Sequence, residues 1–476
     1  IWGYQVVDLD TGAVLLEQNA DKMFVTGSIL KVYATSVALD VLGPEYRFRT
    51  PVFRRGEVAA GTLSGDLVLV ASGDYSFGLR EQPDGTLAYN NFPEIDHNYA
   101  DTGLPGPALV PNSHPLAALD ELAREVRASG IRNVKGDVVI DDRLFETFDG
   151  WPDGLMSPIW VNENVIDIIA TATKPGQAAQ VDWRPKTAAV RVVSDVKTVS
   201  GEAAPLVVDS PRPGIVRVSG QVAADSAPIL NIWQIPDPAA FARTAFIEAL
   251  ERAGVNVSAN ATGPNPTSLL PESRTFQRRN RVAERVSLPL SEYVKVILKV
   301  SYNRGADNMV CLVAVAKGSR ECIDGLRTEL ATITRLGVSP VTTILFDGAG
   351  SSEYDRSTPV DYTTFMRNIT HESWGADLRN GLAILGVDGL AATTEAGTPA
   401  AGHVFVKNGT RVQAVPTGEQ GILSALTQVA YIDAQSGRKL VSALFLRDLS
   451  LGTDIEQFFA AGDDQGAILA AIQQGY

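Results

Sequence analysis

Three short motifs place serine, lysine and asparagine side chains at spacings that suit acyl transfer through a serine. They are Ser28-Ile-Leu-Lys31, Ser301-Tyr-Asn303 and Lys407-Asn-Gly-Thr410, in that order along the chain. A serine hydroxyl is inert at its own pKa, and a lysine activates it only when burial or nearby positive charge leaves the amine neutral. A serine–lysine pair of this kind is a known alternative to the serine–histidine–aspartate triad.

None of the motifs is specific alone, because each loose pattern occurs a second time in the chain. Ser194-Asp-Val-Lys197 lies in an alternating strand pattern, which turns residues three apart to opposite faces. Ser258-Ala-Asn260 lies in sequence typical of an exposed loop, and Lys174-Pro-Gly176 is typical of a turn. Context therefore favours the first three motifs.

The sequence around Ser28 predicts the start of a buried helix. Apolar residues recur at helical spacing over residues 31–42, and Gly43-Pro44 supplies a stop. Three residues along a helix return Lys31 to the face of Ser28, and the helix N-terminus places N–H dipoles beside the hydroxyl. This is the geometry that a serine nucleophile needs.

The other two motifs have equally suitable settings. Ser301-Tyr-Asn303 lies on a short connection between an amphipathic stretch, residues 290–300, and a second helical run, residues 306–317. Both side chains can leave such a loop together, the serine to relay a proton and the asparagine to hold a carbonyl. Lys407 closes a strand pattern at residues 403–406, where Gly409 allows a substrate backbone to approach closely.

The elements that must position these motifs come from both ends of the chain. We expect a hairpin over residues 3–17, antiparallel strands at 422–433 and 439–446, and a final helix at 454–474, broken near residues 462–464. The final helix covers one face of this sheet, and the Ser28 and Ser301 helices cover the other. The predicted α+β catalytic domain comprises residues 1–51 and 285–476. We expect residues 52–284 to form an inserted accessory region of two subdomains, with helices near 116–129 and 238–253.

Further landmarks extend the pattern over nearly the whole chain. They include Val6-Val-Asp-Leu-Asp-Thr-Gly12, Gly65-Asp-Leu-Val-Leu-Val70, Gly136-Asp-Val-Val-Ile-Asp-Asp142, Val161-Asn-Glu-Asn-Val-Ile-Asp167 and Gly386-Val-Asp-Gly389. With the three motifs, they resemble the class C low-molecular-mass penicillin-binding proteins. These are D-alanyl-D-alanine carboxypeptidase/endopeptidases of the penicillin-binding protein 4 type. The resemblance implies a serine β-lactamase/DD-peptidase-like catalytic domain split by a long insertion, as the gap from Ser28 to Ser301 also indicates.

The resemblance also implies roles for individual residues. The family's substrate is a peptidoglycan stem peptide, its inhibitors are β-lactam antibiotics, and it needs no cofactor. Backbone N–H groups of Ser28 and Thr410 would form the oxyanion hole, with Asn408 and Gly409 on the same substrate-binding strand. Asp141 matches a carboxylate that reaches the free amine of the stem peptide, or is a surface aspartate at a strand end. The remaining roles are Ser28 as acylated nucleophile, Lys31 as its base, Ser301 as proton relay, Asn303 as ligand of the substrate amide, and Lys407 and Thr410 as carboxylate binders.

Several positions depart from the family pattern. Asn408 replaces a hydroxyl residue that helps to hold the terminal carboxylate, and Glu353 stands where an arginine is frequent, although Arg356 is close. Ala349 replaces the serine of a common Gly-Ser-Gly, and Thr26-Gly27 replaces Pro-Ala before the nucleophile. These changes motivate an alternative, a binding or scaffolding protein of the cell wall machinery with little or no turnover. Whether carboxypeptidase or endopeptidase cleavage dominates, how fast it is, and which diamino acid the stem carries stay open.

Composition fits an exported enzyme with an acidic surface. The 476 residues carry a net charge of −14, which argues against nucleic acid and anionic membranes as partners. No apolar run approaches the roughly 20 residues of a membrane helix. The chain begins at Ile1 without an initiator methionine, so we expect that processing or trimming removed a targeting segment. By resemblance, the protein belongs in the periplasm or extracytoplasmic envelope, and its oligomeric state is open.

The cysteines and histidines do not predict a metal site. Cys311 and Cys322 are the only cysteines, and the four histidines show no ligand spacing with them. The two cysteines lie on a predicted helical hairpin that turns at Gly318-Ser319, so they form either a disulfide or two separate buried thiols.

An aspartic protease is the rival enzyme class. Asp10-Thr-Gly12 and Asp101-Thr-Gly103 both match its triplet. Such enzymes need two matching strand–loop contexts that bring the carboxylates together. Only the first copy follows an apolar strand, so the pair does not match.

Overall fold

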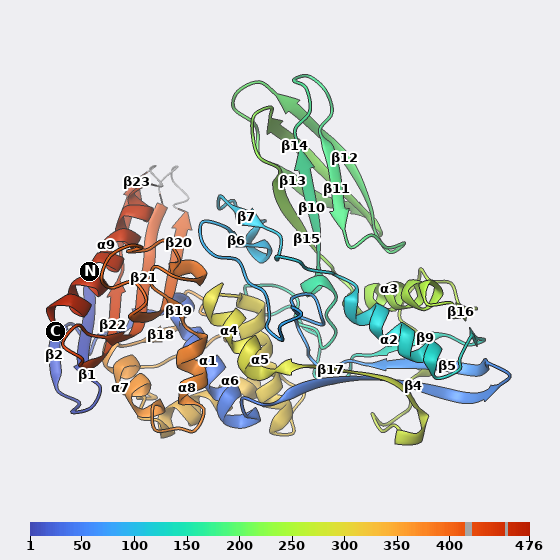
Figure 1. The fold of residues 1–476 in the computed structure, drawn as a ribbon, viewed down its shortest axis with the longest axis horizontal. Helices are drawn as coiled ribbons and strands as arrows, with labels where there is room; N and C mark the ends of the chain where they lie inside the picture. The colour runs from blue at the N-terminus through green and yellow to red at the C-terminus, as the bar shows by residue number, and fades with distance from the viewer. Residues whose placement is uncertain (415–420, 453–455) are drawn as a thin grey trace.

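The chain folds into lobes, one of which is built from both ends of the sequence (Figure 1). The structure is a computed structural model that describes residues 1–414, 421–452 and 456–476. The lobe at the left of Figure 1 holds both termini and a large sheet, and the middle of the chain forms the rest.

The large sheet joins the first strands of the chain to the last. Its order is β19-β20-β21-β22-β1-β2, with β23 beside β21, and every pair is antiparallel. The predicted hairpin and C-terminal strands are therefore confirmed. The bounds are β1 Trp2–Asp8, β2 Val14–Gln18, β19 Ala383–Ile384, β20 Val404–Ala414, β21 Gly421–Asp433, β22 Lys439–Leu446 and β23 Leu449–Gly452.

Helices cover both faces of this sheet, because alternate residues of each strand point to opposite sides. Val429 and Tyr431 of β21 join the main core with the Ser28 helix, whereas Ala430 and Ile432 join a second core with the last helix. The helices of this lobe are α1 Lys31–Leu42, α4 Leu290–Lys299, α5 Asn303–Ala316, α6 Ile323–Arg335, α7 Pro359–Ile369, α8 Gly375–Gly381 and α9 Glu456–Gly475.

The expected break in the last helix is wrong. Helix α9 continues through Gly462, where an added Cβ would meet nothing within 4 Å. Asp463 and Asp464 are both exposed, so these polar residues lie on the outer side of a continuous helix. The predicted start at residue 454 lies outside the described residues.

Two long strands carry the chain out of the terminal lobe and back. Strands β4 (Arg47–Ala59) and β17 (Arg281–Pro289) pair antiparallel, from Arg47 opposite Pro289 to Phe53 opposite Arg281. The domain limits at residues 51 and 285 fall within this pair and stay a prediction. These two strands belong to a second sheet, whose order is β16-β8-β5-β4-β17 with β9 beside β5. Its other strands are β5 Thr62–Val70, β8 Asn133–Val134, β9 Val138–Asp141 and β16 Asn256–Val257.

The rest of the inserted region contains two α-helices, two sheets of three strands, and a short pair of strands, β6 (Ile95–Asp96) and β7 (Pro107–Ala108). Helices α2 (Ala117–Ala128) and α3 (Pro238–Arg252) confirm both predicted helices and share one core with these sheets. The sheets have the orders β11-β10-β15 and β12-β14-β13 and form the upper lobe of Figure 1. Their strands are β10 Val165–Thr171, β11 Gln180–Arg184, β12 Arg191–Val199, β13 Val207–Arg212, β14 Ile215–Ala223 and β15 Ile229–Gln234.

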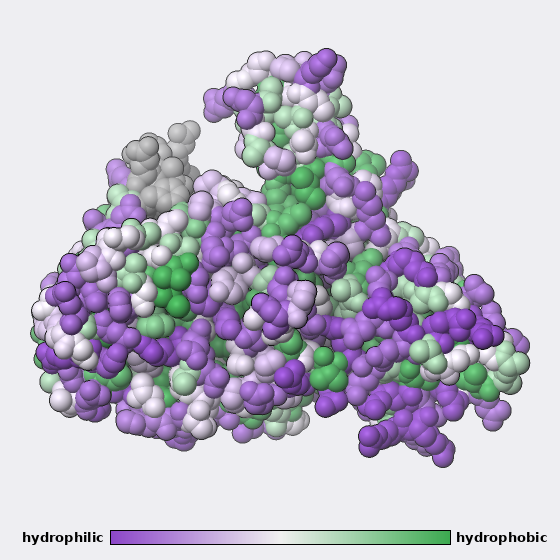
Figure 2. Space-filling model, in the orientation of Figure 1, coloured by the Kyte–Doolittle hydropathy of each residue, from purple (hydrophilic) through white to green (hydrophobic). Residues whose placement is uncertain are grey.

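A disulfide joins Cys311 near the end of α5 to Cys322 just before α6. This resolves the alternative that the sequence left open. The surface in Figure 2 is largely hydrophilic, with apolar residues gathered below the upper lobe. Among the described residues, no helix is both long and apolar enough to cross a membrane.

Candidate active site

Ser28 and Lys31 meet at the start of the first helix. Ser28 lies in a short 3-10 helix, Gly27–Leu30, which leads directly into α1. Lys31 Nζ donates to Ser28 Oγ at 2.8 Å and to the carbonyl of Ala349 at 2.7 Å. The predicted helix is confirmed, and its first turn brings the amine to the hydroxyl.

Burial tunes Lys31 toward the role of a base. The side chain is fully buried, and this desolvation lowers its pKa from 10.5 to about 8, although Asp153, Asp307, Asp347 and Asp355 act in the opposite direction. A substantial fraction of the amine is thus neutral slightly above neutral pH. A neutral amine 2.8 Å from a hydroxyl can take its proton.

A tight loop presents the second acceptor for Lys31. Asp347 accepts hydrogen bonds from the backbone N–H groups of Ala349 at 2.9 Å, Gly350 at 2.6 Å and Ser352 at 2.7 Å. The loop packs so closely on the nucleophile segment that a Cβ on Gly350 would lie 1.9 Å from the carbonyl oxygen of Gly27. Ala349 contacts Lys31 through its backbone, so the alanine at this position preserves the contact.

Ser301 and Lys407 form a second serine–lysine pair. Lys407 Nζ lies 3.0 Å from Ser301 Oγ and 2.5 Å from the carbonyl oxygen of Asn408. Burial, with a smaller contribution from the charge of Lys31, holds the pKa of Lys407 well below its usual value. Ser301 has a positive φ of 62°, a conformation that non-glycine residues rarely adopt. The connection between α4 and α5 therefore aims this hydroxyl at the lysine.

Strand β20 passes directly over the nucleophile segment. A Cβ on Gly409 would lie 2.8 Å from the backbone nitrogen of Ser28 and 2.4 Å from Thr427 Oγ1. A Cβ on Gly27 would lie 3.1 Å from the backbone nitrogen of Thr410. The backbone N–H groups of Ser28 and Thr410 thus belong to one junction. Only glycine fits at position 409, because the strand packs on the nucleophile segment there. The approach of a substrate backbone at Gly409 stays a prediction.

Asn303 contacts two residues that the sequence reasoning missed. Its Nδ2 donates to Asp153 Oδ1 at 2.6 Å, and Tyr99 Oη lies 3.2 Å from its Oδ1. Tyr99 also donates to the carbonyl of Ser301. Tyr99 ends a short 3-10 helix, His97–Tyr99, and Asp153 lies in an irregular stretch; both belong to the inserted region and carry no motif. The only local signal for Asp153 is the turn-forming stretch Gly150-Trp-Pro-Asp-Gly154.

Comparison with known proteins supplies the family. A model of the D-Ala-D-Ala carboxypeptidase 3 (S13) family matches residues 1–455. The chain belongs to this family. It is therefore a serine peptidase of the D-Ala-D-Ala carboxypeptidase family, and the resemblance inferred from the motifs is confirmed.

Relatives within the carboxypeptidase family cover most of the chain. A D-alanyl-D-alanine carboxypeptidase from an Actinomadura species is 27% identical over 440 residues, which are 86% of this chain and 72% of that protein. DacB from Haemophilus influenzae is 22% identical over 407 residues, 81% of this chain and 74% of that protein.

Solved structures of penicillin binding protein 4 from Haemophilus influenzae share the fold. One matches with a TM-score of 0.74 and 20% identity, covering 99% of this chain and 96% of that one. Another, a complex of that protein with a novel β-lactam, matches with a TM-score of 0.71 and 18% identity, covering 99% and 96%. The predicted α+β fold with a divided catalytic domain is confirmed.

Asp141 is the one candidate of the carboxypeptidase site that the structure does not bring to the others. It is fully buried at the end of β9, where Arg143 Nε donates to its Oδ1 at 2.8 Å and the Arg143 Nη2 atom donates to its Oδ2 at 3.0 Å. Arg274 adds a second cation at 3.8 Å. The interpretation of Asp141 as a surface residue is also wrong, because it is a buried anion held by arginines.

Two departures from the family pattern, Asn408 and Glu353, lie on or beside β20. The side-chain oxygen of Asn408 is buried without a hydrogen-bond partner, and Thr410 is exposed. Glu353 accepts a hydrogen bond from Gln413 Nε2 at 2.7 Å, and the Arg356 side chain donates to the Glu353 backbone carbonyl. Position 353 therefore supplies no cation, and its carboxylate lies beside β20.

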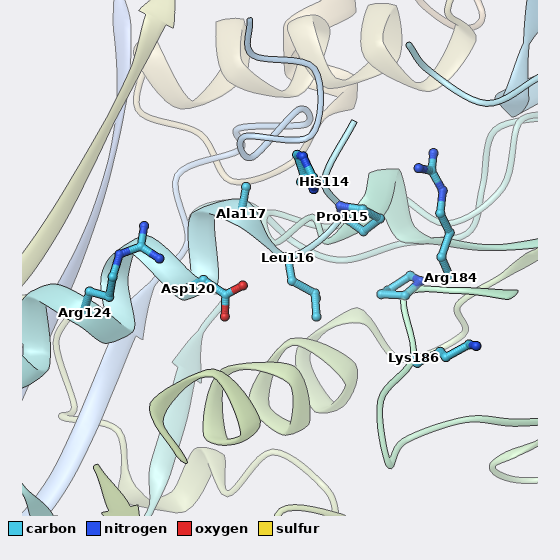
Figure 3. Close-up of a pocket in the computed structure, with 9 residues that line it drawn as sticks. His114, Pro115, Leu116, Ala117, Asp120, Arg124, Arg184 and Lys186 are labelled. Atoms are coloured by element: carbon cyan, nitrogen blue, oxygen red, sulfur yellow. The ribbon is translucent and has the colours of Figure 1, made fainter. Parts of the chain in front are cut away.

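Two other groupings contain no residue of the three motifs. Asp96, His97 and Glu163 are close enough together to hold a metal ion, but they are already engaged with Arg80 and Asp167. The absence of a metal cofactor stays a prediction. A separate pocket lies between the start of α2 and the turn after β11, lined by His114, Leu116 and Arg184 among others (Figure 3). No residue of the three motifs lines it.

The competing motif copies and the protease triplets do not build a second site. Ser194 and Lys197 lie on β12, and Ser258 follows the short strand β16. Asp10 lies at the turn between β1 and β2 in the terminal lobe, whereas Asp101 follows a short helix of the inserted region. The two aspartates thus occupy unrelated settings, as the sequence indicated.

Proposed function

We propose that the protein removes the terminal D-alanine from peptidoglycan stem peptides, or cuts a peptide cross-link, through an acyl-enzyme on Ser28. The observation that carries this proposal is the buried amine of Lys31, 2.8 Å from Ser28 Oγ, with its pKa lowered to about 8. The divided catalytic domain and the family membership support the same substrate class.

In the proposed reaction, Lys31 takes the proton of Ser28 as Oγ attacks the carbonyl carbon of the penultimate D-alanine. The developing oxyanion is stabilised by the backbone N–H groups of Ser28 and Thr410. Ser301, linked to Lys407, delivers a proton to the leaving amine and takes the former Ser28 proton from Lys31, so terminal D-alanine departs and Lys31 is neutral again. Water then attacks the ester as Lys31 takes one of its protons. Lys31 returns that proton to Ser28 Oγ as the shortened peptide leaves, which restores free Ser28.

Substrate binding uses the surrounding residues. Asn303 orients the peptide amide, and Lys407 and Thr410 hold the terminal carboxylate on β20, with Gly409 allowing the peptide to approach. For the free amine of the stem peptide, the geometry favours Asp153 over Asp141. Asp153 contacts Asn303 at 2.6 Å, whereas Asp141 is paired with Arg143. We also propose an extracytoplasmic location, which the disulfide between Cys311 and Cys322 supports.

Intact-mass analysis after incubation with benzylpenicillin tests the nucleophile. We expect one penicilloyl adduct on the wild-type protein and none on Ser28→Ala. Ser194→Ala, at the serine of the competing motif, is the matched control and should acylate normally. Absence of the adduct at millimolar drug would contradict the proposal and favour the second candidate, a binding or scaffolding protein, for which Asn408 and Glu353 are the specific observations.

A further inference from the structure

Two neighbouring residues of the inserted region, Asn98 and Tyr99, form hydrogen bonds with the loop that carries Ser301 and Asn303. Tyr99 donates its phenolic hydrogen to the carbonyl of Ser301, with its Oη 3.2 Å from Asn303 Oδ1. Asn98 accepts a hydrogen bond from Arg304 Nη2 at 3.2 Å. The inserted region therefore contacts this loop at both of its ends.

Ser301 needs such support. Its positive φ of 62° places it in the left-handed region, where a side chain with a Cβ is strained. Strained residues persist where surrounding contacts determine their conformation, and they cluster at functional sites. Tyr99 donates its hydrogen bond to the backbone carbonyl oxygen of this strained residue. It therefore helps to define the direction in which the Ser301 hydroxyl points toward Lys407.

Tyr99 is itself held by a buried network of charges. It ends the short helix His97–Tyr99, which is anchored by Asp96 and His97. Arg80 donates to both oxygens of Asp96, at 2.8 and 2.9 Å, and Asn98 Nδ2 donates to Asp96 Oδ1 at 2.8 Å. These charged groups are fully buried, so each carboxylate and guanidinium is fixed by its partners.

The same network extends beneath the loop. His97 bonds to Asp167 at 2.7 Å and to Glu163 at 3.2 Å. Arg80 also donates to Glu163 and lies 5.8 Å from the centroid of the Tyr302 ring, which sits between Ser301 and Asn303. Every residue from Ser301 to Arg304 thus contacts Tyr99, Asn98 or Arg80.

We infer that Tyr99 is a positioning residue of the acyl-transfer site, which holds Ser301 in the conformation that directs its hydroxyl to Lys407. The inference rests on the proposed function of Ser28. On this view the inserted region completes the catalytic centre, because a residue outside the divided domain sets the orientation of the proton relay.

The test compares acylation rates of Tyr99→Phe and the wild-type protein. The variant keeps the ring and removes only the oxygen. We expect its second-order rate constant for acylation by a fluorescent penicillin to fall about tenfold, the typical effect of losing one well-placed hydrogen bond. Tyr431→Phe is the matched control, because it loses a phenol-to-carbonyl bond to Met366 of 2.6 Å and should acylate at the wild-type rate.

A double-mutant cycle separates positioning from general destabilisation. If Tyr99 acts through Ser301, adding Tyr99→Phe to Ser301→Ala should lower the rate less than threefold, measured by intact mass over hours. Thermal unfolding should place both phenylalanine variants within a few degrees of the wild type. A wild-type rate in Tyr99→Phe, or an equal tenfold loss in the Ser301→Ala background, would overturn the inference while leaving Ser28 acylation intact. A wild-type protein that is not acylated at all would overturn both proposals.

Discussion

Two opposing effects set the pKa of Lys31. Burial removes water from the amine and lowers its pKa, while four surrounding aspartates raise it, and the result lies near 8. A general base works best when its pKa is close to the operating pH. Fewer nearby carboxylates would leave the amine neutral but weakly basic, and more would keep it protonated. The acidic surroundings of Lys31 are therefore part of the machinery.

The pH dependence of acylation follows from this value. Because only neutral Lys31 can act as base, the rate constant should rise with pH, reach half its maximum near pH 8, and be about a hundredfold lower at pH 6. Stopped-flow acylation by a fluorescent penicillin from pH 6 to 9.5 measures this. A flat profile over that range would rule out Lys31 as the titrating base.

Residues close together in sequence could be found from spacing, and distant ones could not. Ser28 and Lys31 are one helical turn apart, so their contact follows from helix geometry. Asp153 and Asn303 are 150 residues apart, and Tyr99 and Asn303 are 204 apart. A one-turn 3-10 helix carries Tyr99 and an irregular stretch carries Asp153, and no periodicity in the sequence predicts where such short segments lie in the fold. The sequence around Asp141 matches the family position and leaves its role open, and only the fold shows that its carboxylate pairs with Arg143.

At the scale of elements, the site depends on how closely β20 approaches the nucleophile segment. Thr427 of β21 donates to the carbonyl of Thr26 at 2.6 Å, which fixes the segment before Ser28 to the sheet. Gly409 of β20 lies between them with no space for a side chain. One helix start and two strands thus form a single rigid unit.

Replacing Gly409 with alanine should push β20 away from the segment that carries Ser28. Its Cβ would lie 2.4 Å from Thr427 Oγ1 and 2.8 Å from the Ser28 backbone nitrogen, so strand and helix must move apart. We expect acylation to fall at least about a hundredfold as the N–H donors shift, and the free energy of unfolding to fall by about 1–3 kcal/mol. Gly462→Ala in α9, with no atom nearby, is the control and should keep the wild-type rate. Wild-type acylation by Gly409→Ala would disprove the close junction.

Regular elements could largely be read from the sequence, and their exceptions have local causes. The periodicity of residues 31–42 matches α1, because its apolar residues pack into the core. Gly462 suggested a break in α9, but a helix tolerates one glycine at a cost of only about 1 kcal/mol. The disulfide requires α5 and α6 to pack so that Cys311 and Cys322 meet. The number of residues between each cysteine and the turn does not determine that packing.

On the scale of the whole molecule, a balanced charge cluster stabilises the part of the inserted region beside the site. Its carboxylates are Asp96, Glu163 and Asp167, and its bases are Arg80, His97 and Arg184. Burial alone would lower the pKa of His97, but Asp167 and Glu163 raise it from 6.5 to about 10. The imidazole is therefore cationic at neutral pH, and removing it leaves buried anions uncompensated.

His97→Gln should expose this dependence. We expect the unfolding free energy at pH 7 to fall by about 3 kcal/mol or more. Since the folded-state pKa is raised, the stabilisation from charged His97 is complete below pH 6.5 and is lost as pH rises through about 10. The difference in unfolding free energy between the wild type and the variant, measured by urea unfolding, should therefore decrease from pH 6 to pH 10. His114→Gln, at an exposed histidine, controls for the substitution. A difference that stays constant would show that His97 is not charged in the fold.

The pairing of β1 with β22 determines the order in which this protein can assemble. Trp2 to Asp8 pair with Leu446 to Leu440, so the catalytic sheet needs both ends of the chain. The sheets of the inserted region use only strands between Arg47 and Pro289 and can form earlier during synthesis. Ser28 is thus made long before the strands that complete its site. A chain that has not yet reached β20 carries Ser28 and Lys31 without that strand, which delays acylation until β20 has been made and has paired.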